Sequence, residues 1–302
     1  MARQIVETDK ALVAQLLEKV LGNANYTAIE RMGGLTNRTY HVTMDNGAKY
    51  VVRIPGEGTE EMINRADEKT STTLACDLGI DANLLYFGDD GAKVTEFIPN
   101  AITMNADIIH QPIHIEQMAQ IFRKLHGCNV DTGVPFEVFQ MADSYERIIS
   151  DKNVGMFDDY AAIKAEVMEI KTEIDGSVDI HKAPCHNDAL CENWVESDGR
   201  MYLIDWEYAG MNDCMWDLAD VSIEAGFDKE HDEMFLKAYL QKDPDVKNWK
   251  HFLANKIYVD YLWTLWAKAR VPYDGQPMED WAAERYARLK ENIQNFRNIM
   301  EV

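Results

Sequence analysis

The sequence is short of cysteine and of basic residues, and each shortage excludes a class of protein. The five cysteines form no CxxC pair, so the chain offers neither a disulfide framework nor a zinc ribbon. This cysteine usage favours a reducing, cytoplasmic setting. Lys and Arg number 30 against 52 Asp and Glu, for a formal charge of −22. Because binding to phosphate backbones requires clustered basic residues, we expect no nucleic-acid partner.

Long hydrophobic runs are missing as well. Charged residues such as Glu7 and Lys10 interrupt the N-terminal segment, which fits an amphipathic helix better than an export signal. The most apolar later stretch, residues 251–271, contains Lys256 and Asp260, which are costly in hydrocarbon. We therefore expect no transmembrane helix and no membrane partner. With 302 residues, of which 46% are hydrophobic, the chain is long enough for one large or two medium domains.

Turns and hydrophobic periodicity divide the chain into a β-rich part and a helical part. The turn at residues 45–47, Asp-Asn-Gly, makes the strand-like segments 39–44 and 49–54 antiparallel neighbours. One helix is expected from Glu60 to Leu78, and helical periodicity dominates after residue 105 except for a β-like hairpin within 184–208. The sequence therefore predicts an α+β protein with a small N-terminal antiparallel β lobe, residues 1–98, and a larger, mostly helical lobe, residues 99–302.

The interrupting hairpin carries the chemistry. It reads His186-Asn187-Asp188-Ala-Leu-Cys-Glu-Asn193, and the apolar strand Leu203-Ile204 that follows leads into Asp205. Phosphoryl transfer to a hydroxyl needs one carboxylate that accepts the proton, together with an amide and a second carboxylate that hold Mg²⁺ against the ATP phosphates. Asp188, Asn193 and Asp205 fill these three roles in the order found in kinases. We expect His186 to support this loop and not to act as the base.

The chain resembles the choline/ethanolamine kinase family, within the aminoglycoside phosphotransferase and protein-kinase-like superfamily, and most closely the bacterial choline kinases. The matching segments run from residue 33 to 267 in family order: GGLTN, YVVR, INR through Glu68, EFI, CHNDALCEN, LIDWEYAGMND, WDLAD and LWTLWA. The resemblance implies a bilobal protein-kinase-like fold, with nucleotide bound by the N-terminal lobe and the acceptor by the helical lobe. It implies the substrates ATP and choline, with Mg²⁺ as cofactor, and leaves the oligomeric state open.

The resemblance also implies a nucleotide site. The loop over the phosphates would contain Gly33, Gly34, Thr36 and Asn37, although a plain β-turn fits the same letters. Arg53 stands where protein kinases carry a phosphate-contacting lysine, and the family also tends to carry arginine there. The alternative for Arg53 is an exposed edge-strand residue.

Two further positions complete the implied nucleotide site. Glu68 matches the carboxylate that pairs with the phosphate-contacting cation, although a solvated glutamate on a charged helix fits the bare sequence equally well. The segment Glu96-Phe97-Ile98 resembles the connector whose backbone receives adenine.

A choline site calls for aromatic rings, because a quaternary ammonium donates no hydrogen bond and is held by cation–π contacts. Trp263 and Trp266 share one helical face, a spacing that equally fits a hydrophobic core. The resemblance adds Tyr208 and Trp281 as further rings and Glu224 as an acidic wall. The segment between residues 270 and 281 contains two prolines and a glycine and is expected to be a loop.

Four other polar residues receive no catalytic role. Asp217 is implied to support the catalytic loop, and Asp220 occupies a position that is more often Asn or Ala in the family. Asp213 is expected in a turn, and His126 at a helix end without a chemical function.

Three competing interpretations remain open on the sequence alone. Another acceptor, such as ethanolamine, thiamine or an aminoglycoside, would keep the enzyme class, but the Trp pair disfavours a polyamine antibiotic. A non-catalytic binding module would lack one of Asp188, Asn193 or Asp205, and all three are present. A protein kinase is disfavoured because no APE-like segment or activation loop follows Asp205.

Overall fold

The computed structural model of the protein describes residues 7–32, 37–56 and 63–299. The chain forms two compact units. The first contains the described residues up to Met104 together with Glu192–Ala209, and the second contains Asn105–Cys191 and the chain from Gly210 onward. The first unit thus includes the hairpin that the sequence analysis assigned to the second lobe. The division into functional lobes at residues 98 and 99 stays a prediction.

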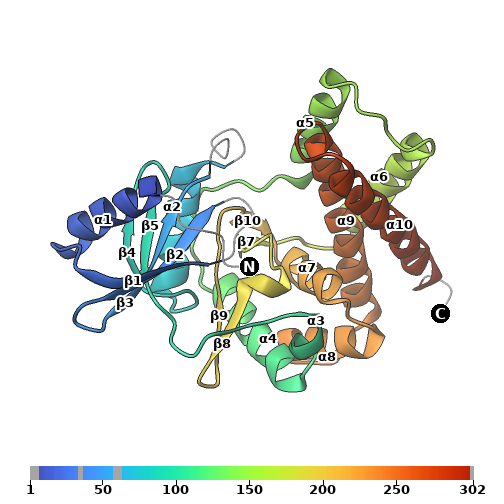
Figure 1. Ribbon diagram of the computed structural model, residues 1–302. Helices are drawn as coiled ribbons and strands as arrows, with labels where there is room; N and C mark the ends of the chain where they lie inside the picture. The colour runs from blue at the N-terminus through green and yellow to red at the C-terminus, as the bar shows by residue number, and fades with distance from the viewer. Residues whose placement is uncertain (1–6, 33–36, 57–62, 300–302) are drawn as a thin grey trace. The chain divides into compact units, whose positions relative to one another are not determined.

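A five-stranded antiparallel sheet, in the order β1-β2-β3-β5-β4, forms the centre of the first unit (Figure 1). Its strands are β1 (Tyr26–Arg31), β2 (Arg38–Met44), β3 (Lys49–Ile54), β4 (Leu84–Phe87) and β5 (Lys93–Glu96). The turn at residues 45–47 joins β2 to β3, with Gly47 at φ 83° and Thr43 paired with Lys49. The predicted antiparallel pairing of these two strands is confirmed.

Two helices accompany this sheet. Helix α1 (Glu7–Leu21) buries Val13 and Leu17 in one cluster with Tyr40, Val42, Val52 and other strand residues, which is the core of the unit. Helix α2 (Arg65–Asp77) begins at Asn64, whose side chain accepts hydrogen bonds from the N–H groups of Ala66 and Asp67. Helix α2 therefore begins after residue 60, where the sequence analysis had placed its start, and it packs against β4.

The remaining strands of the first unit form a second, three-stranded sheet in the order β6-β8-β9. Its strands are β6 (Ile102–Thr103), β8 (Trp194–Ser197) and β9 (Arg200–Leu203), and the short 3-10 helix η2 (Cys191–Asn193) precedes β8. Strands β8 and β9 form the hairpin, with Trp194 opposite Leu203. This pairing puts Asn193 and Asp205, which flank the two strands, at the same end of the hairpin.

Helix α9 (Val246–Asp274) is the main scaffold of the second unit and packs against α5, α6, α7 and α10. The other helices are α3 (Ala106–Ile109), α4 (Pro112–His126), α5 (Val138–Asp151), α6 (Tyr160–Ser177), α7 (Cys214–Ala225), α8 (Lys229–Leu240) and α10 (Gln276–Asn298). Strands β7 (Lys182–Cys185) and β10 (Gly210–Asp213) pair antiparallel and lead into the loop at His186 and into α7, respectively.

The expected loop between residues 270 and 281 was wrong. Helix α9 continues through Pro272 to Asp274, and α10 begins at Gln276, so only Gly275 separates the two helices. Gly275 has φ 71° and ψ −149°, a conformation that is essentially restricted to glycine. The long contact between α9 and α10, visible in Figure 1, stabilises the helical turn that contains the proline.

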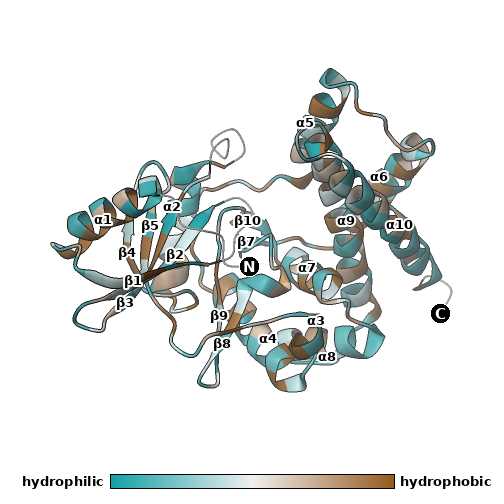
Figure 2. Ribbon diagram, in the orientation of Figure 1, coloured by the Kyte–Doolittle hydropathy of each residue, from teal (hydrophilic) through white to brown (hydrophobic). Residues whose placement is uncertain are grey.

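In the part of the chain that the structure describes, no helix is long and apolar enough to cross a membrane. Helix α9, with 29 residues, carries both hydrophobic and hydrophilic residues along its length (Figure 2).

Candidate functional site

Five charged side chains of the first unit form what we call the arginine–carboxylate cluster: Arg53, Arg65, Glu68, Asp205 and Glu207. Arg53 Nη1, from β3, lies 2.5 Å from Glu68 Oε1 on α2 and 3.7 Å from Asp205 Oδ1. Arg65 Nη1 binds the other oxygen of Glu68 at 2.6 Å and lies 3.7 Å from Glu207 Oε2. The ion pair between Arg53 and Glu68 that the resemblance implied is present, and it is buried.

The electrostatics of this cluster distinguish its two glutamates. Burial alone would raise the pKa of Glu68, but Arg53 outweighs it and holds that pKa below its ordinary value. Burial and the neighbouring Asp205 raise the pKa of Glu207 to about 7. Glu68 is therefore a compensated carboxylate, whereas Asp205 and Glu207 repel each other.

The two expected metal ligands lie together in the first unit. Asn193 ends η2, and its carbonyl oxygen accepts a 2.9 Å hydrogen bond from the N–H of Ile204, the residue before Asp205. The Asp205 backbone has φ 68°, and its side chain is 41% exposed. A left-handed conformation costs energy for a residue with a side chain, and such strain concentrates at functional positions.

Of the other residues expected in the nucleotide site, some lie outside the described residues and the rest can be placed. Gly33, Gly34 and Thr36 lie outside the described residues, whereas Asn37 is buried and donates to Glu207 Oε2 at 3.1 Å. Glu96 ends β5, and its N–H donates to the carbonyl of Asn83, so it serves the sheet. Ile98 follows the strand and is half-buried. Their contact with a nucleotide stays a prediction.

The loop that carries Asp188 belongs to the second unit and is held mainly through its backbone. Asp217 on α7 accepts hydrogen bonds from the N–H groups of His186 and Asn187, both at 2.8 Å. His186 Nδ1 in turn accepts from the N–H of Asp188 at 3.3 Å. These contacts agree with the supporting roles expected of Asp217 and His186.

Several supports of this loop were missed by the sequence analysis. Asp220, which was given no role, accepts a 2.5 Å hydrogen bond from the N–H of Ala189, and Trp216 Nε1 donates to the carbonyl of Asn187. Burial, followed by the charges of Glu224 and Asp188, raises the pKa of Asp220 well above its ordinary value. The i, i+3 spacing of Asp217 and Asp220 on one helix was the available signal.

Two residues outside the loop also have contacts that the sequence did not reveal. His126 ends α4, as expected, but it is buried and its Nε2 lies 3.0 Å from Asp217 Oδ2. Asp213, expected in a turn, caps α7 by accepting from the N–H of Met215. Both residues therefore help to fix α7, which in turn holds the loop that carries Asp188.

The aromatic residues expected to bind the acceptor form a continuous row in the second unit. Trp263 and Trp266 on α9 meet edge to face with their ring centroids 6.2 Å apart, and Trp266 meets Trp281 on α10 in the same way at 5.8 Å. Trp263 is only 5% exposed and also contacts Trp216, whereas Trp266 and Trp281 are half-buried. The row thus has a core end at Trp263 and an accessible end at Trp266 and Trp281.

An arginine that the sequence analysis missed lies at the accessible end of this row. Arg285 is 3% exposed, and its guanidinium carbon lies 4.0 Å from the centroid of the Trp281 ring. Arg285 Nη2 donates to Glu224 Oε1, the expected acidic wall. The structure therefore joins Glu224 to Trp281 through a cation of the chain itself.

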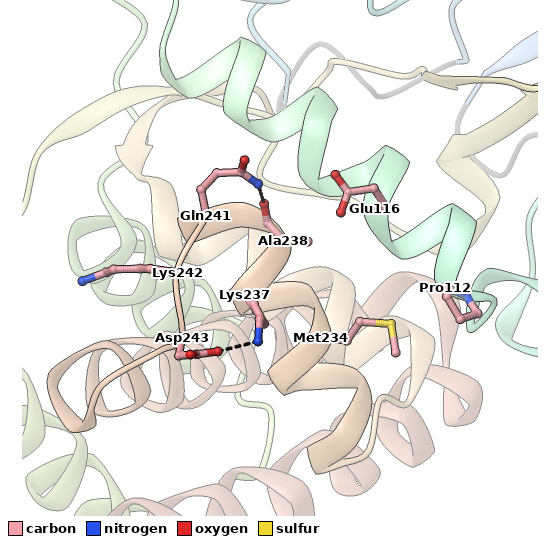
Figure 3. A pocket seen from close by; sticks show the side chains of 8 residues that line it. All are labelled: Pro112, Glu116, Met234, Lys237, Ala238, Gln241, Lys242 and Asp243. Carbon is pink, nitrogen blue, oxygen red and sulfur yellow. Dashed lines mark hydrogen bonds and ion pairs between the residues drawn. The ribbon is translucent and has the colours of Figure 1, made fainter.

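The predicted site residues are thus distributed over both units. Asn193, Asp205 and Tyr208 belong to the first unit, and Asp188, Glu224 and the three tryptophans belong to the second. A surface pocket between α4 and α8 contains none of them (Figure 3). It is lined by Pro112, Glu116, Met234, Lys237, Ala238, Gln241, Lys242 and Asp243, of which Lys237 and Asp243 form an ion pair at 2.5 Å.

Comparison with known proteins gives consistent matches. The family model described as choline/ethanolamine kinase matches residues 29–300. A crystal structure of a choline/ethanolamine kinase family protein from Mesorhizobium loti is similar with a TM-score of 0.86 and 31% identity, covering 98% of both chains. The structure of choline kinase LicA from Streptococcus pneumoniae is similar with a TM-score of 0.81 and 29% identity over 96% of this chain and all of that one.

Sequence comparison agrees with the structural matches. Protein LicA of Haemophilus influenzae is 27% identical over 266 residues, which is 84% of this chain and 76% of LicA. The predicted α+β fold of the protein-kinase-like type is confirmed. This chain belongs to the choline/ethanolamine kinase family and is an ATP-dependent small-molecule kinase.

Proposed function

We propose that the protein is a choline kinase, which transfers the γ-phosphoryl group of ATP to the hydroxyl of choline with the help of Mg²⁺. The observation that carries the proposal is the accessible end of the tryptophan row, where Trp266 and Trp281 meet at 5.8 Å and a guanidinium already lies over Trp281. Rings arranged in this way attract a cation that has no hydrogen to donate. The similarity to the choline kinase LicA of Streptococcus pneumoniae supports the same choice of acceptor.

Asp188 is proposed to orient the choline hydroxyl and to accept its proton as the oxygen attacks phosphorus. Backbone N–H groups of the loop donate to Asp217 and Asp220 on α7, and these hydrogen bonds fix the path of the loop that carries Asp188. A fixed loop lowers the cost of bringing the hydroxyl into line with the phosphate. Asp217 and Asp220 are positioning residues in this scheme.

The nucleotide side of the proposal uses the arginine–carboxylate cluster. Arg53, oriented by Glu68, contacts the ATP phosphates, and the connector at Glu96 to Ile98 receives the adenine. A related LicA structure contains AMP, which supports nucleotide binding by this fold. Asn193 and Asp205 fit Mg²⁺, because amide and carboxylate oxygens are the hard donors this ion prefers and both residues lie at one end of the hairpin. When bound, Mg²⁺ neutralises phosphate charge.

Ethanolamine is the alternative acceptor, since the family covers both alcohols. A primary ammonium would seek a carboxylate, but Arg285, which donates to Oε1 of Glu224, already neutralises part of the charge of that carboxylate. The rings, in contrast, retain accessible area at Trp266 and Trp281. This difference favours choline.

The test is ADP release with choline, ethanolamine, thiamine and an aminoglycoside as acceptors, each at the same concentration with Mg²⁺ and ATP. We expect the highest kcat/KM with choline and none above background in the Asp188→Ala variant, which controls for ATP hydrolysis by contaminants. A higher kcat/KM with ethanolamine than with choline would show that ethanolamine is the preferred acceptor. Turnover of none of the four by a folded protein would contradict the proposal.

A further inference from the structure

A group of metal-binding side chains in the second unit takes no part in the proposed reaction. The group, which we call the thiol–imidazole cluster, contains His126, Cys185 and Cys214, whose ligand atoms all lie within 4.8 Å of one another. His126 ends α4, Cys185 ends β7 and Cys214 begins α7, so three separate elements converge there. His126 and Cys185 are buried, and Cys214 is half-buried.

The distances within the cluster are close to those of a metal site. Zn²⁺ binds thiolate sulfur at roughly 2.3 Å and imidazole nitrogen at roughly 2.0 Å, so that tetrahedral donors stand roughly 3.5–4 Å apart. Each pair of the three atoms therefore needs to approach by no more than about 1.3 Å to surround such an ion. Two thiolates and one imidazole are a donor set typical of zinc among the divalent ions of cells.

The surroundings of His126 already orient the ring as a metal ligand. Its Nε2 lies 3.0 Å from Asp217 Oδ2, and its Nδ1 lies 2.9 Å from the Tyr239 hydroxyl. Metal-bound imidazoles commonly donate their other N–H to a carboxylate in this way, which fixes the tautomer and strengthens the ligand. Asp217 thus supplies the supporting carboxylate on one side of the ring, and on binding the ion the ring gives up its contact with the Tyr239 hydroxyl.

We propose that His126, Cys185 and Cys214 form a binding site for a zinc-like divalent cation, with water as the fourth ligand. Access for the ion and the water is on the side of the half-buried Cys214. The site ties the end of β7, which immediately precedes His186, to the start of α7, which carries Asp217. Its occupation stabilises the fold around the loop that carries Asp188. The site shares Asp217 with the support of that loop but uses no group proposed to contact choline, ATP or Mg²⁺, so the inference is independent of the proposed acceptor.

The test is a titration of the full, chelator-treated and reduced protein with Co²⁺, followed by Zn²⁺. We expect one equivalent of Co²⁺ to produce sulfur-to-cobalt charge-transfer absorption, which Zn²⁺ then removes because it binds such sites more tightly. Cys214→Ser should lower the Co²⁺ affinity at least about tenfold. Cys128→Ser, which changes another half-buried thiol outside the cluster, is the matched control and should leave the titration unchanged.

Zn²⁺ should also raise the melting temperature of the wild type and of Cys128→Ser, but not that of Cys214→Ser. Cys185→Ala provides a second variant in case the serine variant folds poorly. Absence of the charge-transfer band in the wild type, or its persistence in both cluster variants, would overturn the proposal. So would formation of a disulfide between Cys185 and Cys214 under mild peroxide in a protein that binds no metal when reduced, because the pair would then be a redox pair only.

Discussion

The two units each contain a buried arginine paired with a glutamate, and the two pairs differ in which partner is expected to meet a substrate. Arg53 in the first unit is held by Glu68 and by the carbonyl of Gly91, and it faces Asp205. Arg285 in the second unit is held by Glu224 and lies over Trp281. In the first pair the cation is the proposed functional group and the carboxylate orients it. In the second pair the carboxylate and the ring are the proposed functional groups, and the arginine orders both.

The arginine–glutamate ion pair is therefore proposed to serve a different purpose in each unit. A buried arginine that one carboxylate orients has further N–H donors, through which it can bind the oxygens of an anion such as a phosphate. A carboxylate that is already neutralised by an arginine attracts a cation only weakly, so the neighbouring rings must supply most of the attraction. This contrast predicts that substitutions in the first pair weaken the use of ATP. Substitutions in the tryptophan row, which lies beside the second pair, should instead weaken the use of choline.

The largest effect is expected where neither pair is involved. Asp188→Ala removes the group that accepts the acceptor's proton, so kcat should fall by at least about a hundredfold. Nucleotide affinity, measured by calorimetric titration, should change little. A folded variant with near-native turnover would show that Asp188 is not the base.

The next effect concerns the exposed carboxylate that faces the first pair. Asp205→Asn weakens the coordination of Mg²⁺, so activity at low Mg²⁺ should fall roughly tenfold or more and be partly recovered at high Mg²⁺. Asp188→Ala should show no such recovery and serves as the control. An unchanged Mg²⁺ dependence in a weakened but folded enzyme would remove Asp205 from the metal site.

Arg53→Ala tests the first pair itself. The apparent KM for ATP should rise about tenfold, because a charge-assisted contact with phosphate is lost, while the KM for choline stays near its native value. Arg53→Lys keeps the positive charge but loses the forked guanidinium donors, so its KM for ATP should lie between those of the wild type and Arg53→Ala. Equal ATP affinity of wild type and Arg53→Ala would exclude a phosphate contact.

Leucine variants of the tryptophan row test the neighbourhood of the second pair. Trp266→Leu should raise the choline KM roughly tenfold, because a desolvated cation–π contact contributes about 1–2 kcal/mol. Trp263→Leu, at the buried end of the row, should lower the melting temperature more than Trp266→Leu does. If Trp266→Leu melts lower yet uses choline with native KM, the whole row belongs to the core and the preference for choline loses its basis.

The smallest effect on turnover is expected for a buried carboxylate that forms no ion pair among the described residues. Asp81 in the first unit is fully buried, and burial raises its pKa to about 6. Its protonated form is favoured in the native state, so the stability that it contributes is present at low pH and is lost as the pH rises through 6. Asp81→Asn should therefore raise the free energy of unfolding on the order of 2 kcal/mol at pH 7.5 and much less at pH 4. Denaturant titrations at both pH values measure this, and an equal gain at both would contradict the assignment.

The local elements of this fold were predictable because their signals are local. The Asp-Asn-Gly turn predicted the pairing of β2 with β3, and the helical periodicity after residue 105 predicted the mostly helical character of that part of the chain. The β-like hairpin predicted within 184–208 is present as β8 and β9, whereas the roles of Asp188, Asn193 and Asp205 beside it stay a prediction. Short-range chemistry, namely turn residues and helical periodicity, carries this information.

The contacts that join distant segments were not predictable from local patterns. Arg285 and Glu224 stand 61 residues apart, and nothing in either neighbourhood indicates the other. Pro272 suggested a break, but packing of α10 along α9 outweighed the local preference. The supporting role of Asp220 depends on a backbone N–H from a loop 31 residues earlier, which side-chain letters cannot reveal.

Gly275 has a consequence for the proposed acceptor site, namely how much of it must become ordered when a ligand binds. The hinge between Trp266 and Trp281 is a single residue whose backbone angles only glycine adopts readily. With so short a connection, the two rings have almost no conformational freedom to surrender when a ligand arrives, so the binding free energy is not reduced by ordering a loop. A substitution that adds a side chain at position 275 would strain the backbone between α9 and α10 without contacting any ligand. Acceptor affinity should then fall, although no residue of the proposed site has changed.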